Sequence, residues 1–177
     1  GLLFEALPPS IGIPILITQH LPPQFMPIFA RQLSAATGYE AAVAADDEPL
    51  VANRILIAPG GAHLMVRAKA GRMRVHLSHE KSESGFMPSV DPMFDSLAEA
   101  LGQRALGVVL SGMGRDGIIG ARRIVEVGGT VMAQDEQSSS VWGMPRAVAE
   151  AGLASSILSP ADLADKIADS LEGEAWN

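Results

Sequence analysis

A histidine and an aspartate each follow a short apolar run that predicts a buried strand. His20 comes directly after residues 13–19. Asp116 lies in the glycine-rich turn 111–117, which follows the apolar run 105–110. Ligands of open α/β sheets bind beyond the carboxyl ends of the strands, so the two side chains can converge on one crevice. A carboxylate that orients an imidazole and stabilises its cation is the arrangement of a hydrolase triad.

Each of the two residues also fits a simpler structural role. His20 precedes the sequence Leu21-Pro22-Pro23 and fits a surface histidine at a turn. Asp116 precedes a helix predicted over residues 118–127 and fits the N-cap of that helix. Spacing alone favours these simpler roles.

A hydrolase triad also needs a nucleophile, and the serines of this chain are poorly placed for it. Ser111 ends a predicted strand but lacks the G-x-S-x-G pattern of a nucleophile elbow. Ser10 lies in a connector, and residues 138–140 form a polar turn. No serine is predicted on a sharp strand-to-helix turn beside His20.

A second motif overlaps the turn that carries Asp116. Gly112, Gly114 and Gly117 form a G-x-G-x-x-G pattern between a predicted strand and a predicted helix, and Asp135 follows the next predicted strand. This pattern is typical of dinucleotide binding, with the acidic residue on a ribose hydroxyl. However, the carboxylate of Asp116 would face the pyrophosphate. This weakens dinucleotide binding but leaves it open.

A metal site is the least favoured of the chemical alternatives. His76, His79 and Glu80 lie close together in the sequence, with His63 upstream. Their spacing suits a helix, whereas here they straddle a predicted hairpin and a loop, so a solvated loop is favoured over a zinc site. The sequence has no cysteine, which excludes a cysteine nucleophile and thiolate metal ligands. We expect neither a metal nor an organic cofactor.

Composition limits the classes of partner. The 177 residues carry a net charge of −7, which argues against a large nucleic-acid footprint, since such a footprint needs a basic face. No apolar run is long enough to span a bilayer, and no signal peptide is visible. The absence of cysteine fits a reducing compartment. We therefore expect a cytoplasmic protein without membrane insertion.

Strands and helices are predicted to alternate along the chain. The predicted parallel strands cover residues 13–19, 54–58, 105–110 and 130–133. The predicted helices cover residues 25–33, 92–101 (with Asp91 as N-cap), 118–127, 145–150 and 160–171. Residues 63–67 and 73–77 predict a β-hairpin around the turn 69–72. The expected fold is α/β, with a mostly parallel, doubly wound sheet, helices on both faces and one antiparallel hairpin excursion.

Several motifs together resemble the CheB-type protein-glutamate methylesterases in order and spacing, over about residues 2–171. They are Ile17-Thr18-Gln19-His20-Leu21-Pro22-Pro23, Ile57-Ala58-Pro59-Gly60 with His63, Pro88-Ser89-Val90-Asp91, Leu110-Ser111-Gly112-Met113-Gly114-Arg115-Asp116-Gly117 and Gly143-Met144-Pro145-Arg146. The resemblance implies hydrolysis of glutamate γ-methyl esters on methyl-accepting chemotaxis receptors, with deamidation of receptor glutamines as a further activity. It favours the esterase over dinucleotide binding.

By the same resemblance, His20 is the general base, Asp116 its orienting carboxylate and the backbone N–H of Met113 an oxyanion donor. The nucleophile of the family is a serine in a Gly-Ala-Ser-Thr-Gly-Gly-like turn, which the 177 residues do not contain. We therefore expect residues 1–177 to be a single catalytic domain without its first strand and serine turn, inactive alone, and without the receiver domain that usually precedes it. The alternative is a non-catalytic relative that binds a receptor or regulator. Met87 stands where the family often has arginine, which affects contacts with the substrate surface.

Overall fold

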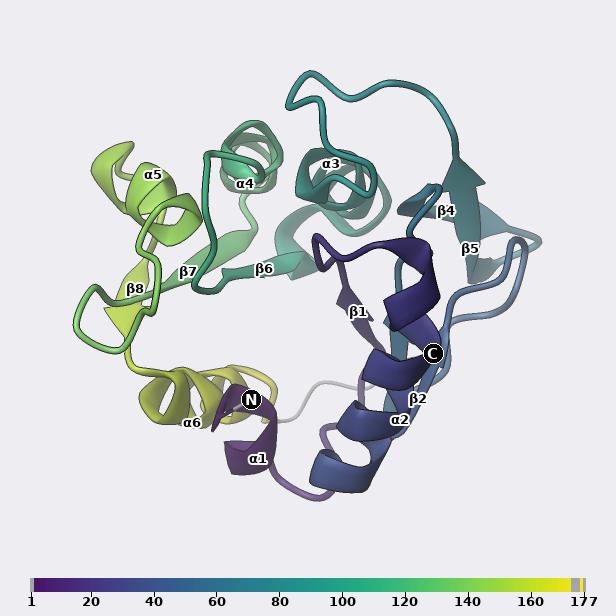
Figure 1. The fold of residues 1–177 in the computed structure, drawn as a ribbon, viewed down its shortest axis with the longest axis horizontal. Helices are drawn as coiled ribbons and strands as arrows, with labels where there is room; N and C mark the ends of the chain where they lie inside the picture. Colours follow the sequence, from purple (N-terminus) through teal and green to yellow (C-terminus); the bar gives the residue numbers. More distant parts are fainter. Residues whose placement is uncertain (1, 173–175, 177) are drawn as a thin grey trace.

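The parallel strands form two separate three-stranded sheets in a computed structural model, which describes residues 2–172 and 176 (Figure 1). The first sheet has the order β1-β3-β2, with β1 at Ile15–Ile17, β3 at Arg54–Ile57 and β2 at Glu40–Val43. The second has the order β6-β7-β8, with β6 at Leu106–Val109, β7 at Thr130–Gln134 and β8 at Ser156–Leu158. All pairings within these two sheets are parallel.

A third, antiparallel pair forms the predicted hairpin. It consists of β4 (His63–Lys69) and β5 (Arg72–Ser78), with His63 opposite Ser78 and Lys69 opposite Arg72. The turn contains Ala70 and Gly71, both with positive φ, as tight hairpin turns require. Strand β4 of the hairpin packs against α3 (Val90–Leu101), and residues 79–89 connect β5 to that helix.

Helices cover both faces of the parallel sheets (Figure 1). One face carries α3, α4 (Ile118–Glu126) and α5 (Met144–Glu150). The other carries α1 (Leu2–Ala6), α2 (Met26–Thr37) and α6 (Pro160–Ser170), and short 3-10 turns cover Pro23–Phe25 and Gly102–Arg104. The predicted α/β fold, with a parallel doubly wound arrangement and one antiparallel excursion, is confirmed.

Burial on both faces explains the continuous apolar runs of the parallel strands. In β3, Ile55 and Ile57 belong to the apolar cluster with α2, while Leu56 between them belongs to the cluster with α3. All three side chains are almost fully buried. A strand that packs against helices above and below needs apolar side chains at every position.

The element boundaries correct several expectations. The strand predicted over residues 13–19 is shorter in the structure, where it covers only β1. It cannot begin earlier because Pro14 has no N–H to donate to a neighbouring strand. The edge strands β2 and β8 were not predicted, because their sequences Glu-Ala-Ala-Val and Ser-Ile-Leu lack the continuous branched apolar run of the central strands. Helix α3 begins earlier than predicted, and its N-cap is Ser89 instead of Asp91. Helix α6 begins at Pro160 after the Ser159 cap, as predicted.

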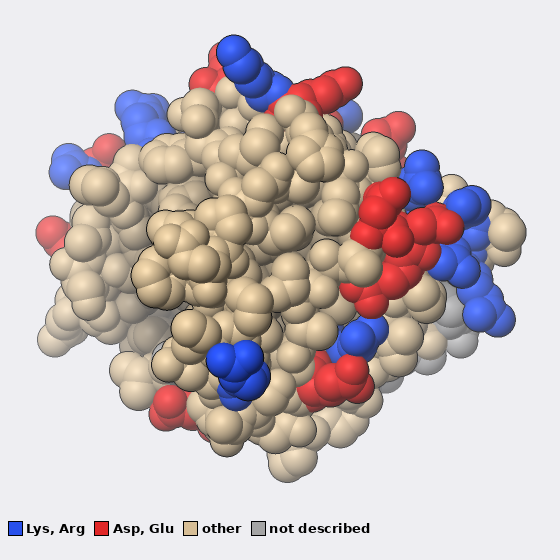
Figure 2. Space-filling model, turned by 45° about the vertical axis from the view of Figure 1, so that its right-hand side comes forward, with Lys and Arg blue, Asp and Glu red and all other residues tan. Residues whose placement is uncertain are grey.

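The charged side chains do not form one continuous surface of a single sign on the face drawn in Figure 2. Acidic and basic groups lie beside one another near its edge, and its centre is largely free of both. Asp47 illustrates this mixing, since it forms ion pairs with Arg67 and Lys69. In the described part of the chain, no helix is long and apolar enough to cross a membrane.

Candidate active site

The side chains of His20 and Asp116 meet at the carboxyl ends of β1 and β6. Nε2 of His20 lies 2.7 Å from Oδ2 of Asp116, and the two residues come from different parallel sheets. The His20 side chain is 22% exposed, whereas that of Asp116 is fully buried. The expectation that the two side chains lie within hydrogen-bond distance is confirmed, whereas only His20 lines the neighbouring cavity and Asp116 is buried behind it. Asp116 does not cap α4, because the N-cap of that helix is Gly117.

Asp116 is held as a carboxylate by several donors. Its Oδ1 accepts from the Ser89 hydroxyl at 2.7 Å, and its Oδ2 accepts from the Val90 N–H at 2.8 Å. Burial alone would raise its pKa, but the hydrogen bonds from His20, Ser89 and Val90 outweigh burial and lower the pKa to about 2. The group is therefore ionised at neutral pH.

The charge on Asp116 determines which nitrogen of His20 carries a proton. An ionised carboxylate only accepts hydrogen bonds, so Nε2 of His20 must be the donor in the 2.7 Å contact. A neutral imidazole has one N–H and one lone pair. The lone pair of neutral His20 is therefore on Nδ1, and Nδ1 is the basic atom.

Glycines let the 111–117 turn place Asp116 under the start of α3. Gly117 has φ +98°, which L side chains rarely adopt, and a Cβ there would lie 3.1 Å from Val90. Gly114 has φ +88°. The turn thus approaches α3 closely enough for the Asp116 carboxylate to accept from the N-terminus of that helix.

A second backbone segment holds the part of this turn that contains Met113. The N–H of Gly112 donates to Val141 O at 3.0 Å, and Gly112 O accepts from the N–H groups of Gly143 and Met144. A Cβ on Gly143 would lie 2.7 Å from Gly112 O, so this close approach requires glycine. Met113 itself is 77% exposed, and no described residue accepts a hydrogen bond from its N–H. Its backbone donor is therefore free to bind an oxygen.

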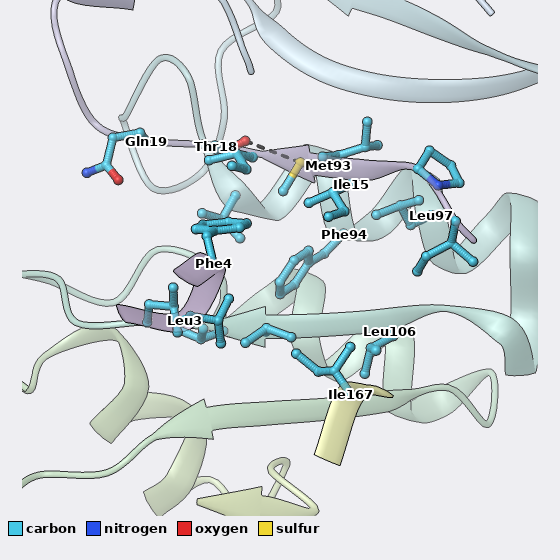
Figure 3. Close-up of a pocket in the computed structure, with 18 of the residues that line it drawn as sticks. Leu3, Phe4, Ile15, Thr18, Gln19, Met93, Phe94, Leu97, Leu106 and Ile167 are labelled. Atoms are coloured by element: carbon cyan, nitrogen blue, oxygen red, sulfur yellow. Dashed lines mark hydrogen bonds between the residues drawn. The ribbon is translucent and has the colours of Figure 1, made fainter. Parts of the chain in front are cut away.

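An apolar cavity of about 300 Å³ lies between the two parallel sheets and includes His20 in its wall. Ile15 of β1 and Leu106 of β6 line opposite sides, while Phe94 comes from α3 and Leu3 from α1 (Figure 3). Among the described strands, β1 pairs only with β3, and β6 pairs only with β7. The cavity therefore separates two strand edges whose backbone groups can still pair.

Asp91 is a second buried carboxyl group in the same region. Its Oδ1 accepts from the Gly120 N–H at 2.9 Å in the first turn of α4. Burial, reinforced by the nearby charge of Asp116, raises the pKa of Asp91 to about 6 despite the opposing hydrogen bonds from Gly120 and Gly117. The Asp116 carboxylate at the start of α3 and the Asp91 carboxyl group at the start of α4 thus differ strongly in acidity.

The remaining sequence candidates have structural contacts elsewhere. The Ser111 hydroxyl donates to Val141 O, and Asp135 accepts from the N–H and hydroxyl of Ser138 within its own turn. His63 is buried, accepts at Nδ1 from the Ser89 N–H and bonds Glu80 O through Nε2. Within residues 2–172 and 176, no group of three or more histidine, cysteine or acidic side chains could hold a metal ion.

Two residues at the site were not predicted from the sequence. Ser89 connects the N-terminus of α3 to Asp116, and the Phe86 ring stacks on the His20 ring at a centroid distance of 4.2 Å. Ser89 belongs to the Pro88-Ser89-Val90-Asp91 motif, but nothing in the sequence indicated its hydrogen bond to Asp116. Phe86 directly follows the polar loop 78–85, and an aromatic residue at such a position could have indicated a role at the site.

Known proteins resemble this chain along nearly its whole length. The family model described as CheB methylesterase matches residues 2–167. A protein-glutamate methylesterase/protein-glutamine glutaminase of Azospirillum brasilense is 45% identical over 160 residues, which cover 88% of this chain and 41% of that protein. A protein of the same name from Maricaulis maris is 45% identical over 171 residues, 97% of this chain and 43% of that protein.

A solved structure supports the same relationship. The CheB methylesterase catalytic domain of Thermotoga maritima has 32% sequence identity and a TM-score of 0.92, with 96% of this chain and 89% of that domain covered. The chain spans about two fifths of the length of the curated relatives it matches. Since the family model, the relatives and the fold agree, the chain belongs to the CheB methylesterase family.

Proposed function

We propose that this domain hydrolyses glutamate γ-methyl esters, and deamidates glutamines, on methyl-accepting chemotaxis receptors by a Ser-His-Asp mechanism. The observation that carries the proposal is the 2.7 Å contact between His20 Nε2 and the ionised, buried Asp116 at the wall of a cavity. The family and its relatives' names supply the substrate class. We propose no metal or organic cofactor, because the triad chemistry needs none.

In the proposed mechanism, Nδ1 of His20 removes the proton from the serine hydroxyl as the serine oxygen attacks the ester carbonyl. Asp116 stabilises the resulting imidazolium through the proton on Nε2. The free N–H of Met113 donates to the tetrahedral oxyanion, an interaction worth about 3–4 kcal/mol per donor in other hydrolases. His20 then protonates the departing methoxide, and water, deprotonated by His20, hydrolyses the acyl-enzyme to regenerate the serine and leave a free glutamate side chain on the receptor.

The serine is proposed to come from a segment outside the 177 residues that enters the cavity as a parallel strand between β1 and β6. Three observations support this. The cavity is lined by apolar side chains of both sheets, the two facing strand edges have backbone groups free to pair, and part of the Thermotoga domain has no counterpart in this chain. Such a strand would end at the same edge as His20, where the serine turn must lie.

We also propose the partners and the location of the whole protein from its curated relatives. The curated relatives are more than twice as long as the matched region, which leaves room for a receiver domain that acts in cis or in trans. The proposed substrates are the cytoplasmic parts of the receptors, and we propose a cytoplasmic protein that meets them there. A domain that binds receptors without catalysis remains the alternative outcome of the test.

The test compares the 177-residue chain with a version extended at its N-terminus through the serine turn. Methanol release from radiolabelled receptor membranes should occur only with the extended version, and serine-to-alanine replacement should abolish it. Full activity from the 177 residues alone would refute an external nucleophile and direct attention to Ser111. An extended version that folds, as shown by its thermal melt, but releases no methanol would support the non-catalytic alternative.

A further inference from the structure

Phe86 makes an aromatic contact with the proposed base that the mechanism above does not use. Its ring lies parallel to the His20 imidazole, with an interplanar angle of 6° and a centroid distance of 4.2 Å. Phe86 is 40% exposed, so its ring covers His20 without being part of the main core. An exposed aromatic side chain stacked on a candidate base indicates a role at the site.

The loop that carries Phe86 is hydrogen-bonded into the same network as Asp116. The Ser82 hydroxyl donates to Phe86 O at 2.9 Å, and the Phe86 N–H donates to Ser84 Oγ at 3.2 Å. Ser84 Oγ donates to Ser89 Oγ at 3.0 Å, and Ser89 in turn donates to Asp116. One loop thus places both the ring above His20 and a donor to its carboxylate partner.

The other side of this arrangement is supplied by the 111–117 turn. A Cβ built on Gly114 would lie 3.8 Å from Cε2 of Phe86, so the edge of the ring packs beside the glycine backbone. The ring therefore contacts both His20 and the turn that carries Asp116. Its position is determined by two elements of the site, although its outer surface is open to solvent.

His20 needs such a restraint because its hydrogen bond fixes only one point of the ring. A ring held through Nε2 alone can tilt about that contact, and tilting would move Nδ1 away from a nucleophile. Offset, near-parallel stacking is one of the two arrangements that aromatic pairs prefer, and the interplanar angle of 6° belongs to that class. The phenyl face therefore supplies a second point of contact, which opposes tilting of the imidazole about its hydrogen bond.

We propose that Phe86 is a positioning residue for His20, which fixes the plane of the imidazole. The role in turnover rests on the proposed function, but the restraint on the ring does not. Phe86 touches neither the ester nor the serine in this proposal. It acts by keeping Nε2 on Asp116 and Nδ1 directed toward the reacting groups.

The first experiment uses the 177-residue chain and needs no turnover. Nuclear magnetic resonance of histidine-labelled protein would measure how fast the His20 Nε2 proton exchanges with water. Phe86→Leu should speed this exchange on the order of tenfold, the upper range for an aromatic pair, and Phe86→Tyr should restore the slow rate. Phe25→Leu, an exposed aromatic replaced in the same way, is the matched control and should leave the rate unchanged.

The second experiment measures turnover in the N-terminally extended version. Phe86→Leu should lower kcat about three- to tenfold with KM unchanged, and Phe86→Tyr should recover it. Exchange and kcat both within twofold of the unchanged protein would overturn the proposal, as would a rise in KM alone, which would make Phe86 a substrate contact. If Phe86→Leu were to unfold, Phe86→Met would take its place under the same criteria. An extended version without activity would refute the proposed function. The exchange experiment would still show whether Phe86 restrains the His20 ring.

Discussion

The carboxyl ends of β6 and β1 supply different parts of the site and are held in different ways. At the end of β6, Asp116 accepts hydrogen bonds from the start of α3, and Gly112 is bonded three times to residues 141–144. At the end of β1, the His20 side chain has one hydrogen bond, to Asp116, and one stacked ring, Phe86. The Asp116 carboxylate and the proposed oxyanion donor are thus held by residues packed around the 111–117 turn, whereas the proposed base, His20, is held by partners from other elements.

This contrast shows where the site is preorganised and where it can be disturbed. Removing a partner from the β6 end leaves a buried charge or donor without compensation, which affects folding as well as chemistry. Removing a partner from His20 leaves a partly exposed ring, which affects chemistry alone. Variants at the β6 end should therefore lose both stability and activity, whereas variants at the β1 end should lose activity alone.

The largest effect is expected for Asp116→Asn. The amide cannot stabilise the imidazolium, and it favours the wrong tautomer of His20, so kcat in the N-terminally extended version should fall about a hundredfold to ten-thousandfold. Both carboxylate oxygens of Asp116 accept hydrogen bonds in the structure. The NH2 group of the asparagine would replace one of these acceptors and would point at a hydrogen-bond donor. We therefore expect a loss of about 1–3 kcal/mol in the free energy of unfolding.

Methanol release and urea denaturation, measured on the same sample, check both parts of this prediction. His20→Gln is the matched variant at the β1 end and should abolish turnover with little loss of stability, because His20 is partly exposed. Equal losses of stability in the two variants would contradict the comparison between the two ends. Unchanged turnover in Asp116→Asn would remove Asp116 from the mechanism.

A smaller effect is expected for Ser89→Ala. The hydroxyl of Ser89 donates to Asp116 and also caps α3 by accepting from the Asp91 N–H. Its loss should raise the pKa of Asp116, lower kcat about tenfold and cost about 1 kcal/mol of stability. Ser159→Ala removes the cap of α6 far from the site and is the matched control. It should cost a similar stability and leave kcat unchanged, and a similar fall of kcat in both variants would show that the Ser89 effect is one of helix capping only.

The two ends also differ in how much of them could be predicted from the sequence. The proximity of His20 and Asp116 could be predicted because each follows a strand. Parallel strands place their carboxyl ends at one edge of a sheet, whatever lies between them in the sequence. The resemblance added Met113, whose exposed side chain gives no signal for the role of its backbone N–H. These predictions depended on local patterns and on sheet topology.

The partners of these residues could not be predicted because they depend on tertiary packing. Ser89 and Asp91 both lie at a helix start, where either one fits an N-cap. Ser89 is the cap and also donates to Asp116 of the 111–117 turn, whereas the Asp91 side chain accepts from Gly120 of α4, and both of these long-range contacts depend on the tertiary fold. Likewise, β2 and β8 are short edge strands whose pairing depends on neighbours distant in the sequence.

The smallest expected effect is a pH dependence of stability that arises from Asp91 at the β6 end. Burial raises the pKa of Asp91 from its ordinary 3.8 to about 6 in the folded protein. Between these values, the folded protein binds a proton that the unfolded chain does not, so stability rises as pH falls. This contribution is fully present below pH 3.8 and is lost as pH rises through about 6. Asp116, with its pKa near 2, stays ionised throughout this window.

Linkage gives the magnitude of this effect. Lowering the pH from about 7.5 to about 5.5 should add roughly 0.8 kcal/mol to the free energy of unfolding through Asp91 alone. Asp91→Asn keeps an oxygen that can accept from Gly120 but cannot titrate, so it should remove this increment. Urea denaturation of both proteins at several pH values isolates the contribution of Asp91, because all other titrating groups cancel in the difference. A difference that is constant with pH would show that Asp91 has the same pKa in the folded and unfolded protein, and that burial does not hold it protonated below pH 6.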